Sequence, residues 1–270
     1  MTKRWRTWAT VVLGVLLFAN PAVAASSDAK QGDDAFEWSN AVPAGKEIEI
    51  KGVNGDIKAT RATGREVEVK ARKSWRRSDP GEVTIEVIEH EDGVTICAKY
   101  PAPFGKENVC GPGDKGHMST NNNDVRVDFE VRVPAGVRLV ARTVNGGIDA
   151  DGLQSPVEAM TVNGSVRVTT SVYASAETVN GSITAAMGSS QWPEPIAFST
   201  VNGAIRLTLP GKLDADLRAE TMNGSIDSDF PVTVTGHFSK RRIQGTIGKG
   251  GRRLELGTVN GDIVLRSGSS

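Results

Sequence analysis

The chain has few aromatic residues, few cysteines and histidines, and no excess of either charge. Of its 270 residues, 5% are aromatic, 2 are cysteine and 3 are histidine, while 32 basic residues balance 32 acidic ones. A net charge of zero gives no electrostatic reason to expect nucleic acid as a partner. The hydrophobic content of 38% and the charged content of 24% exclude a disordered tail, a multispan membrane protein and a collagen-like fibre.

Motifs of catalysis and of metal binding are missing from the sequence as well. It contains no Gly-x-Ser-x-Gly, His-Glu-x-x-His or phosphate-binding loop. The histidines, His90, His117 and His237, lack ligand spacing, so we expect neither a metal nor a cofactor. Paired carboxylates could serve a glycan-cleaving solenoid enzyme. The three aspartate pairs, Asp149/Asp151, Asp214/Asp216 and Asp227/Asp229, nevertheless fall at different phases of the repeat described below, and we predict a non-enzymatic protein.

The N-terminus has the pattern of a secretory signal peptide. Lys3, Arg4 and Arg6 precede the short apolar run Val11–Ala19, and Ala22-Val23-Ala24 is a small-residue cleavage site. An uncleaved anchor is the alternative, but the apolar run is short for a bilayer span. We expect removal of residues 1–24, which leaves 29 basic against 32 acidic residues and no transmembrane segment. The mature protein is then exported to the periplasm, to the cell surface or to the medium.

Only two cysteines are present, Cys97 and Cys110. In an oxidising compartment such a pair most simply forms one disulfide. This bond would close the loop 98–109 and contribute about 3 kcal/mol to stability. Two buried free thiols are the alternative.

A five-residue unit, aliphatic–Asn–Gly–x–Ile/Val, recurs along the second half of the chain. Its copies are Val144–Ile148, Val162–Val166, Val179–Ile183, Val201–Ile205, Met222–Ile226 and Val259–Ile263. With the degenerate copy Ile243–Ile247 included, the steps are 18, 17, 22, 21, 21 and 16 residues. A corner motif repeated at such a period is typical of a stacked solenoid. A single early copy, Val53–Ile57, stands apart from the others.

Alternation around each unit predicts which side chains face inward. Before each Asn, one parity is apolar or small and ends in Thr and Asn, whereas the other parity carries Arg, Glu and Ser. The period of two in a strand places the first set inside. After the corner, the inner face resumes at Ile148, Val166, Ile183, Ile205, Ile226 and Ile263. The aliphatic residue before each Asn falls on the polar parity, so it is either turned inward by a bulge or part of an external apolar stripe.

The corner residues themselves suggest a structural ladder. Glycine allows the positive φ of a tight corner, and asparagine tolerates it next best. We expect the amides to point inward and to bond to their copies one coil away, with threonine hydroxyls pairing likewise. This ladder comprises Asn145, Asn163, Asn180, Asn202, Asn223 and Asn260. Two alternatives are a ligand-binding array and independent Asn-Gly hairpins in an up-and-down sheet.

The first half of the mature chain alternates without a repeat. Strand-like stretches are Ile48–Val53, Glu66–Ala71, Val83–His90, Val94–Tyr100 and Val125–Val133. We therefore predict an all-β protein with a disordered linker at residues 25–40 and an antiparallel N-terminal β region at 41–134 that caps the repeat. Residues 135–266 are predicted to form a single-stranded β-helix-like solenoid, followed by a tail at 267–270. Gly105–Asp124 is expected to be a long exposed loop, and a register shift is expected at the degenerate copy, where strict parity would bury Lys240 and Arg242.

Two basic clusters are candidates for binding an anion such as lipopolysaccharide or an acidic glycan. The first surrounds Trp75 and contains Lys70, Arg72, Lys73, Arg76 and Arg77. The second lies in the acid-free stretch between Asp229 and Glu255, with Lys240, Arg241, Arg242, Lys249, Arg252 and Arg253. The alternative interpretation is a solvated hairpin tip and a charged terminal coil that prevents edge pairing.

The unit Thr143-Val144-Asn145-Gly146 with its copies, and Val133-Pro134 leading into the first coil, resemble a bacterial family of unknown function known as "putative adhesin". The resemblance covers about residues 40–266. It implies an all-β, non-enzymatic, envelope-associated protein, and it transfers no catalytic or binding residue. We accordingly expect an adhesin-like interaction module or a structural module of the cell envelope, with an envelope protein or a glycan as partner. The sequence specifies neither that partner nor the oligomeric state.

Overall fold

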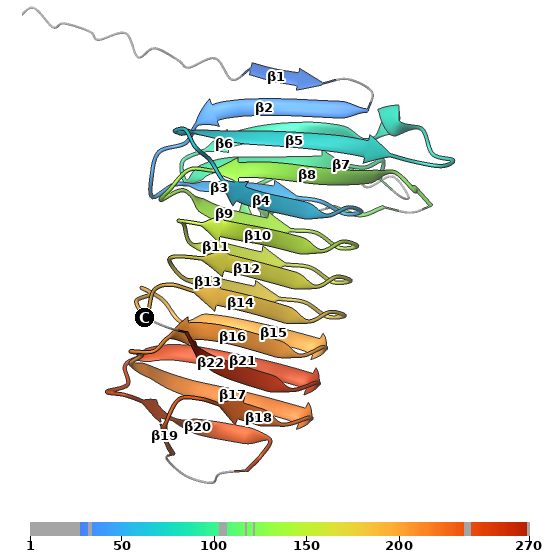
Figure 1. Ribbon diagram of the computed structural model, residues 1–270. Coiled ribbons are helices and arrows are strands. Elements are labelled where there is room, and N and C mark those ends of the chain that lie inside the picture. The colour runs from blue at the N-terminus through green and yellow to red at the C-terminus, as the bar shows by residue number, and fades with distance from the viewer. Residues whose placement is uncertain are drawn as a thin grey trace, which may run out of the picture.

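Two face-to-face sheets of eleven strands each make up the computed structural model, which describes residues 28–31, 34–102, 107–116, 118–120, 122–234 and 239–268 (Figure 1). The expected signal peptide lies outside these residues. Sheet A has the order β1 (Asp28–Gln31), β2 (Ala35–Ala41), β5 (Glu66–Ser74), β8 (Arg126–Val133), β4 (Ile57–Arg61), β10 (Ile148–Leu153), β12 (Val166–Thr170), β14 (Ile183–Met187), β16 (Ile205–Pro210), β22 (Ile263–Gly268), β18 (Ile226–Ser228). Sheet B has the order β6 (Thr84–His90), β7 (Gly93–Lys99), β3 (Glu47–Lys51), β9 (Arg138–Arg142), β11 (Val157–Met160), β13 (Ala174–Glu177), β15 (Ile196–Asn202), β21 (Arg252–Asn260), β17 (Ala215–Asn223), β20 (Arg242–Ile247), β19 (Val232–Val234).

Each repeat forms one flattened coil of a β-solenoid. A strand of sheet B runs into the Asn-Gly corner, and the chain returns as a strand of sheet A, as in β9–β10 and β11–β12. Neighbouring coils pair in parallel and in register, with Ile148 beside Val166 and Val166 beside Ile183. The parallel pairing confirms the solenoid and contradicts the alternative of independent antiparallel hairpins.

The inner face is the one that alternation predicts. Inward side chains of both sheets are buried and form one continuous core. Ile148, Val166, Ile183, Ile205 and Ile263 are at most 1% exposed, whereas Ile226, in the short terminal strand β18, is only partly buried.

The solenoid begins earlier than the expected boundary at residue 135. Strands β3 and β4, joined by the early Asn54-Gly55 corner, pair in parallel with β9 and β10 and so form the first coil. The cap consists of β1, β2, β5 and β8 in sheet A and of β6 and β7 in sheet B. Of the expected disordered linker at 25–40, residues 28–31 form β1 and residues 35–40 form most of β2, which pairs with β5 and buries Phe36 and Trp38.

The C-terminal coils do not stack in the order of the sequence. The last coil, β21–β22, lies between the coils β15–β16 and β17–β18. The degenerate copy Ile243–Ile247 forms no coil, because it lies in β20, which pairs antiparallel with β17 and closes the C-terminal end. In β20 Ile243 and Ile247 are buried while Arg242 is exposed, so no basic side chain is buried there.

Close contact between coils explains why glycine occupies every corner. A Cβ placed on Gly146, Gly164, Gly181 or Gly203 would lie 1.9–2.0 Å from the carbonyl oxygen of the corner glycine in the neighbouring coil. Among the corner glycines only Gly55 and Gly261 have positive φ, at 138° and 155°. The expectation that positive φ selects glycine is therefore wrong for most corners, and the approach of one backbone to the next is the reason instead.

The predicted disulfide between Cys97 and Cys110 is formed, with a Cα–Cα distance of 5.8 Å. It holds the stretch after β7 against the outer face of sheet B. Lys51 Nζ donates to the carbonyl oxygens of Gly111 and Gly113, and the Gly113 N–H donates to Glu49 Oε2 at 3.0 Å. Asn108 is 1% exposed. The loop Gly105–Asp124 is thus not exposed throughout, in contrast to the expectation.

We expect Gly181→Ala to lower the free energy of unfolding by about 2 kcal/mol or more, because the new methyl group overpacks against Gly164. Gly257→Ala is the matched control, since a Cβ there meets nothing within 4 Å, and it should change stability by less than about 0.5 kcal/mol. Urea unfolding monitored by circular dichroism measures both. Equal effects of the two substitutions would contradict the corner argument.

The double substitution Cys97→Ala and Cys110→Ala should lower the free energy of unfolding by about 2–4 kcal/mol, the usual contribution of a native disulfide. Urea titrations of both proteins measure the difference. Alkylation of wild-type protein without prior reduction, followed by mass spectrometry, gives the independent check. Labelled Cys97 and Cys110 peptides in that experiment would contradict the disulfide.

Candidate functional site

Columns of identical or similar residues run along the corner edge of the solenoid. Each Thr–aliphatic–Asn–Gly–x unit contributes one residue to each of five columns, and the coils set the spacing, roughly 4.8 Å per rung. In the Asn column, the order along the stack is Asn54, Asn145, Asn163, Asn180, Asn202, Asn260, Asn223. This edge is the most regular surface of the molecule.

The asparagine amides form a continuous hydrogen-bonded ladder. Each Nδ2 donates to the Oδ1 of the adjacent rung at 2.7–2.9 Å, from Asn145 to Asn54 at one end and from Asn223 to Asn260 at the other. The side chains of the six predicted residues are exposed. The expectation of an inward ladder is therefore wrong in direction, because the chain has already begun to turn when it reaches Asn. A side-chain amide suits the ladder since it can donate on one side and accept on the other.

The threonines, by contrast, point inward and are buried. Their hydroxyls do not pair with one another as expected. Thr178 Oγ1 donates to the carbonyl oxygen of Gly164 at 2.9 Å and Thr200 Oγ1 to that of Gly181 at 2.8 Å, and the other rungs repeat this bond. Each threonine thus binds the glycine carbonyl that the adjacent corner approaches.

A further ladder involves the residue after each corner glycine. Asp56 Oδ1 accepts from the Gly147 N–H at 2.7 Å, and Asp262 Oδ1 accepts from the Ser225 N–H at 2.8 Å. Ser165 and Ser182 accept in the same way from the next rung. The hydrogen bonds that Ser225 donates to Asp262 hold the pKa of this carboxyl group below its ordinary value. Sequence reasoning missed this role, although the recurrence of Ser and Asp at that position was the signal.

From Val162 onward the aliphatic column lies outside, which resolves for these coils the choice that parity left open, whereas Val53 is buried and Val144 is packed against the core. Val162, Val179, Val201 and Met222 are 38%, 37%, 39% and 62% exposed, and they account for four of the six exposed large hydrophobic side chains of the described residues. Val259 continues the column between Val201 and Met222. We call these five residues the aliphatic stripe. It runs beside the asparagine ladder over five consecutive coils.

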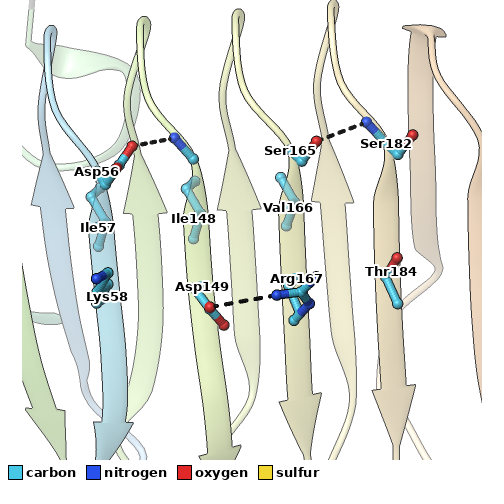
Figure 2. Close-up of a pocket in the computed structure, with 11 residues that line it drawn as sticks. Asp56, Ile57, Lys58, Ile148, Asp149, Ser165, Val166, Arg167, Ser182 and Thr184 are labelled. Carbon is cyan, nitrogen blue, oxygen red and sulfur yellow. Dashed lines mark hydrogen bonds and ion pairs between the residues drawn. The ribbon is translucent and has the colours of Figure 1, made fainter.

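A shallow polar depression lies next to the corner on the outer face of sheet A (Figure 2). It encloses about 310 Å³ over β4, β10, β12 and β14. Lys58, Asp149, Arg167 and Thr184 occupy equivalent outward positions there, and Asp149 lies 3.9 Å from Arg167. The depression exists because Gly147, Ser165 and Ser182 are small. Its polar lining consists of the hydroxyls of Ser165, Ser182 and Thr184, the weak Asp149–Arg167 ion pair, and the charged groups of Asp56 and Lys58.

The two predicted basic clusters lie at opposite ends of the solenoid, so they do not form one site. In the first, Lys70 Nζ pairs with Glu37 at 2.8 Å, and Lys73 is buried with its Nζ on the Pro80 carbonyl. Trp75, 44% exposed, and the neighbouring Arg76 and Arg77 face a hollow that Asp124 also lines. The remaining member, Arg72, is exposed on β5.

The second cluster surrounds the C-terminal cap. Arg242 pairs with Glu220 at 3.3 Å and Arg253 with Glu255 at 3.9 Å, while Arg252 bonds to Gln191. Lys240 and Arg241 are exposed in the turn that enters β20. Within the described part of the chain, Lys240 and Arg241 at this end of the molecule therefore have no ion pair.

The aspartate pairs do not assemble into an active site. Asp227 and Asp229 both bind Arg266, at 2.8 and 3.0 Å. Asp149 lies in sheet A, whereas Asp216 lies in sheet B on β17. Within the described residues, no three His, Cys, Asp or Glu side chains are placed to hold a metal ion.

Sequence reasoning also missed a buried ionic network beneath the disulfide-closed loop. Glu49, 1% exposed, lies 3.4 Å from Lys51 Nζ and 3.2 Å from Arg142 Nε, and it accepts from Thr95 Oγ1 at 2.9 Å. Nearby, burial raises the pKa of Glu47. Glu47, Glu49 and Lys51 lie on the outer parity of β3, which alternation alone assigns to solvent, and nothing in the sequence indicates that a loop covers Glu49 and Lys51. The network anchors that loop.

A family profile described as Toastrack DUF4097 matches residues 39–266 of the chain. No curated protein is similar enough in sequence to count as a match. No helix among the described residues combines the length and apolar character needed to cross a bilayer.

Several solved bacterial structures are similar to the chain. One is described as a "putative cell adhesion protein" from Clostridium sporogenes; it is 12% identical, with 89% of this chain and all of that one covered and a TM-score of 0.47. A "putative adhesin" from Bacteroides fragilis is 11% identical, with coverages of 87% and 98% and a TM-score of 0.31. Another from Parabacteroides merdae is 11% identical, with coverages of 86% and 96% and a TM-score of 0.24.

Asn180→Leu should lower the free energy of unfolding by about 1–2 kcal/mol, because it removes the bonds to Asn163 and Asn202 at a solvent-exposed position. Urea unfolding measures the loss. Glu177→Gln, a control three residues earlier on the same coil, should stay within about 0.5 kcal/mol of wild type. An unchanged stability of Asn180→Leu would show that the ladder does not stabilise the fold.

Proposed function

The chain belongs to the Toastrack DUF4097 family, and we propose that it is an exported, non-enzymatic module of the cell envelope that binds an envelope protein through the aliphatic stripe. The observation that carries the proposal is the stripe itself. Monomeric soluble proteins rarely align exposed aliphatic side chains in a contiguous row, and such rows mark interaction surfaces. Here the row is rigid, because every member stands beside a corner fixed by its glycine contact, its threonine bond and the asparagine ladder.

The environment of the stripe suits a protein partner. The asparagine column alongside it is neutral, and each amide nitrogen keeps one hydrogen beyond the one in the ladder. A partner can therefore bury the stripe and bond to the amides without desolvating a charge. This is the usual composition of an interface, with an apolar core and a polar rim.

Export is supported by the disulfide, since such bonds persist in oxidising compartments. The signal-like N-terminus agrees with it. The cell envelope is therefore the location that we propose.

The alternative function, binding of lipopolysaccharide or an anionic glycan, has weaker support. The two basic clusters lie at opposite ends, and several members are already engaged, as Lys70 is by Glu37 and Arg242 by Glu220. A glycan-cleaving role for the aspartate pairs has less support still, because Arg266 forms ion pairs with both members of one pair and the other two pairs lie apart.

The double substitution Val179→Glu and Val201→Glu tests the proposal. Purified mature protein is mixed with envelopes isolated from the source cells, and the sedimenting fraction is quantified. We expect the double variant to bind at least about tenfold more weakly than wild type, since charge in the centre of an apolar interface costs more than 1.4 kcal/mol.

The control is Thr184→Glu, which places a charge on the outer face of sheet A, away from the stripe. It should bind as wild type does, and melting temperatures confirm that all variants fold. Equal binding by wild type and the double variant, or an equal loss in the control, would contradict the role of the stripe.

A further inference from the structure

At each end of the solenoid, one sheet extends further than the other, and the difference in the number of strands is the same at both ends. Counting from the first coil, sheet A continues through β8, β5, β2 and β1, whereas sheet B continues only through β7 and β6. At the other end, sheet A stops at β18 of its terminal coil, whereas sheet B continues beyond β17 through β20 and β19. Sheet A thus projects by two strands at the N-terminal end and sheet B by two strands at the C-terminal end (Figure 1).

These projections are complementary to each other. If a second copy follows in the same orientation, its β1 comes beside β18 of the first copy and its β6 comes beside β19. Both sheets then continue across the junction without a gap. All four are edge strands, and within the described residues each pairs with a single neighbouring strand. On the free edge of β18, the Ile226 N–H already donates to the Lys240 carbonyl oxygen at 3.1 Å, so the next copy pairs with the part of β18 beyond Ile226. Edge strands are templates for pairing with another chain unless something blocks them.

The charges of the two ends of sheet B are opposite. From residue 82 to 92, the segment that holds β6 contains Glu82, Glu86, Glu89, Glu91 and Asp92 and no Lys or Arg. Glu82, Glu89, Glu91 and Asp92 are exposed, and among the described residues only Glu86 of the five has an ion pair, with Lys99. From 230 to 254, the segment that holds β19 and β20 contains six basic residues and no acid.

The basic end likewise carries exposed charged side chains that form no ion pair within the described residues. Lys240, Arg241 and Lys249 are exposed and have no ion pair among the described residues. Lys249 lies in the turn after β20, at the end of that strand where the β6–β7 turn of a following copy comes. A head-to-tail contact therefore brings the acidic edge of one copy to the basic edge of the next.

From the offset and the charges we propose that this chain self-associates head to tail, with the C-terminal end of one copy seated on the N-terminal end of the next so that both sheets continue through the contact. The occupant of each end is a second copy of this chain. A contact between two different surfaces of the same molecule leaves one free surface at each end, so the assembly is an open fibre rather than a closed dimer. The contact does not use the aliphatic stripe, so the proposal stands independently of the proposed function.

Sedimentation velocity of the mature protein at increasing concentration tests the proposal. We expect the weight-average mass to rise beyond that of a dimer at low ionic strength and to fall with added salt, because exposed charges drive the contact. Electron microscopy should show unbranched fibres. A mass equal to one chain at every concentration overturns the proposal, and so does an association that strengthens with salt.

Charge reversal identifies the surfaces. Arg241→Glu with Lys249→Glu, or Glu82→Lys with Glu91→Lys, should each weaken self-association at least about tenfold, because like charges then meet at both ends of the edge strands. An equimolar mixture of these two variants should assemble again, since each reversed end meets a partner of opposite charge. Failure of the mixture to assemble overturns the orientation.

Two controls separate this contact from other surfaces. Lys58→Glu with Arg206→Glu makes the same change of net charge on the outer face of sheet A and should assemble as wild type does. Val179→Glu with Val201→Glu should also assemble normally, whatever its effect on envelope binding. Loss of assembly in either control overturns the end-to-end contact, and circular dichroism verifies that every variant is folded.

Discussion

The contact of each corner glycine with the backbone of the next coil is the constraint on which the structure depends. At Gly164 or Gly181 a single added carbon would come within 2.0 Å of a carbonyl oxygen, so the coils can stack at strand spacing only where the corner carries no side chain. The threonine hydroxyl bonds to that same carbonyl, and the asparagine amide bonds sideways one position earlier. The glycine, threonine and asparagine of each repeat thus all stabilise the same contact between neighbouring backbones. The outward position of the aliphatic residue follows, because the inward side is occupied by threonine.

The coil architecture could be predicted because the repeat expresses a local requirement. Alternation assigned Ile148, Val166 and Ile183 to the core correctly, since a strand buries every second residue whatever its neighbours are. The same reasoning failed for the asparagine that follows each inward threonine by two residues. It carried the parity from Thr178 to Asn180, but the chain turns between them, so the amide is exposed while the threonine is buried. A period of two holds within a strand and ends where the corner begins.

Features that depend on contacts between segments far apart in the sequence could not be predicted from it. All complete coils share one register and one corner, so any coil can stack on any other, and nothing local places β21–β22 between β15–β16 and β17–β18. The early corner at Asn54 joins the stack across ninety residues of chain, and its single occurrence concealed its role. Glu49 and Lys51 have the alternation of an exposed strand face, and only the disulfide-anchored loop makes them buried. In each case the deciding partner lies far away in sequence.

In a solenoid built this way, the backbone hydrogen bonds are satisfied along the side but not at the two ends. Along its length each coil satisfies the hydrogen bonds of its neighbours, and the corner columns repeat the same chemistry at every rung. At the ends the repeat stops, and unpaired strand edges must be blocked or used. The chain blocks them partly, with short strands such as β18 and β19 and with charge. In sheet B, however, the exposed charges at one edge are acidic and those at the other are basic, so each edge repels an identical edge and attracts the other one. The side of the solenoid and its ends therefore present two separate surfaces: an apolar one, which we propose for a foreign partner, and a charged, hydrogen-bonding one, which we propose for a further copy of the chain.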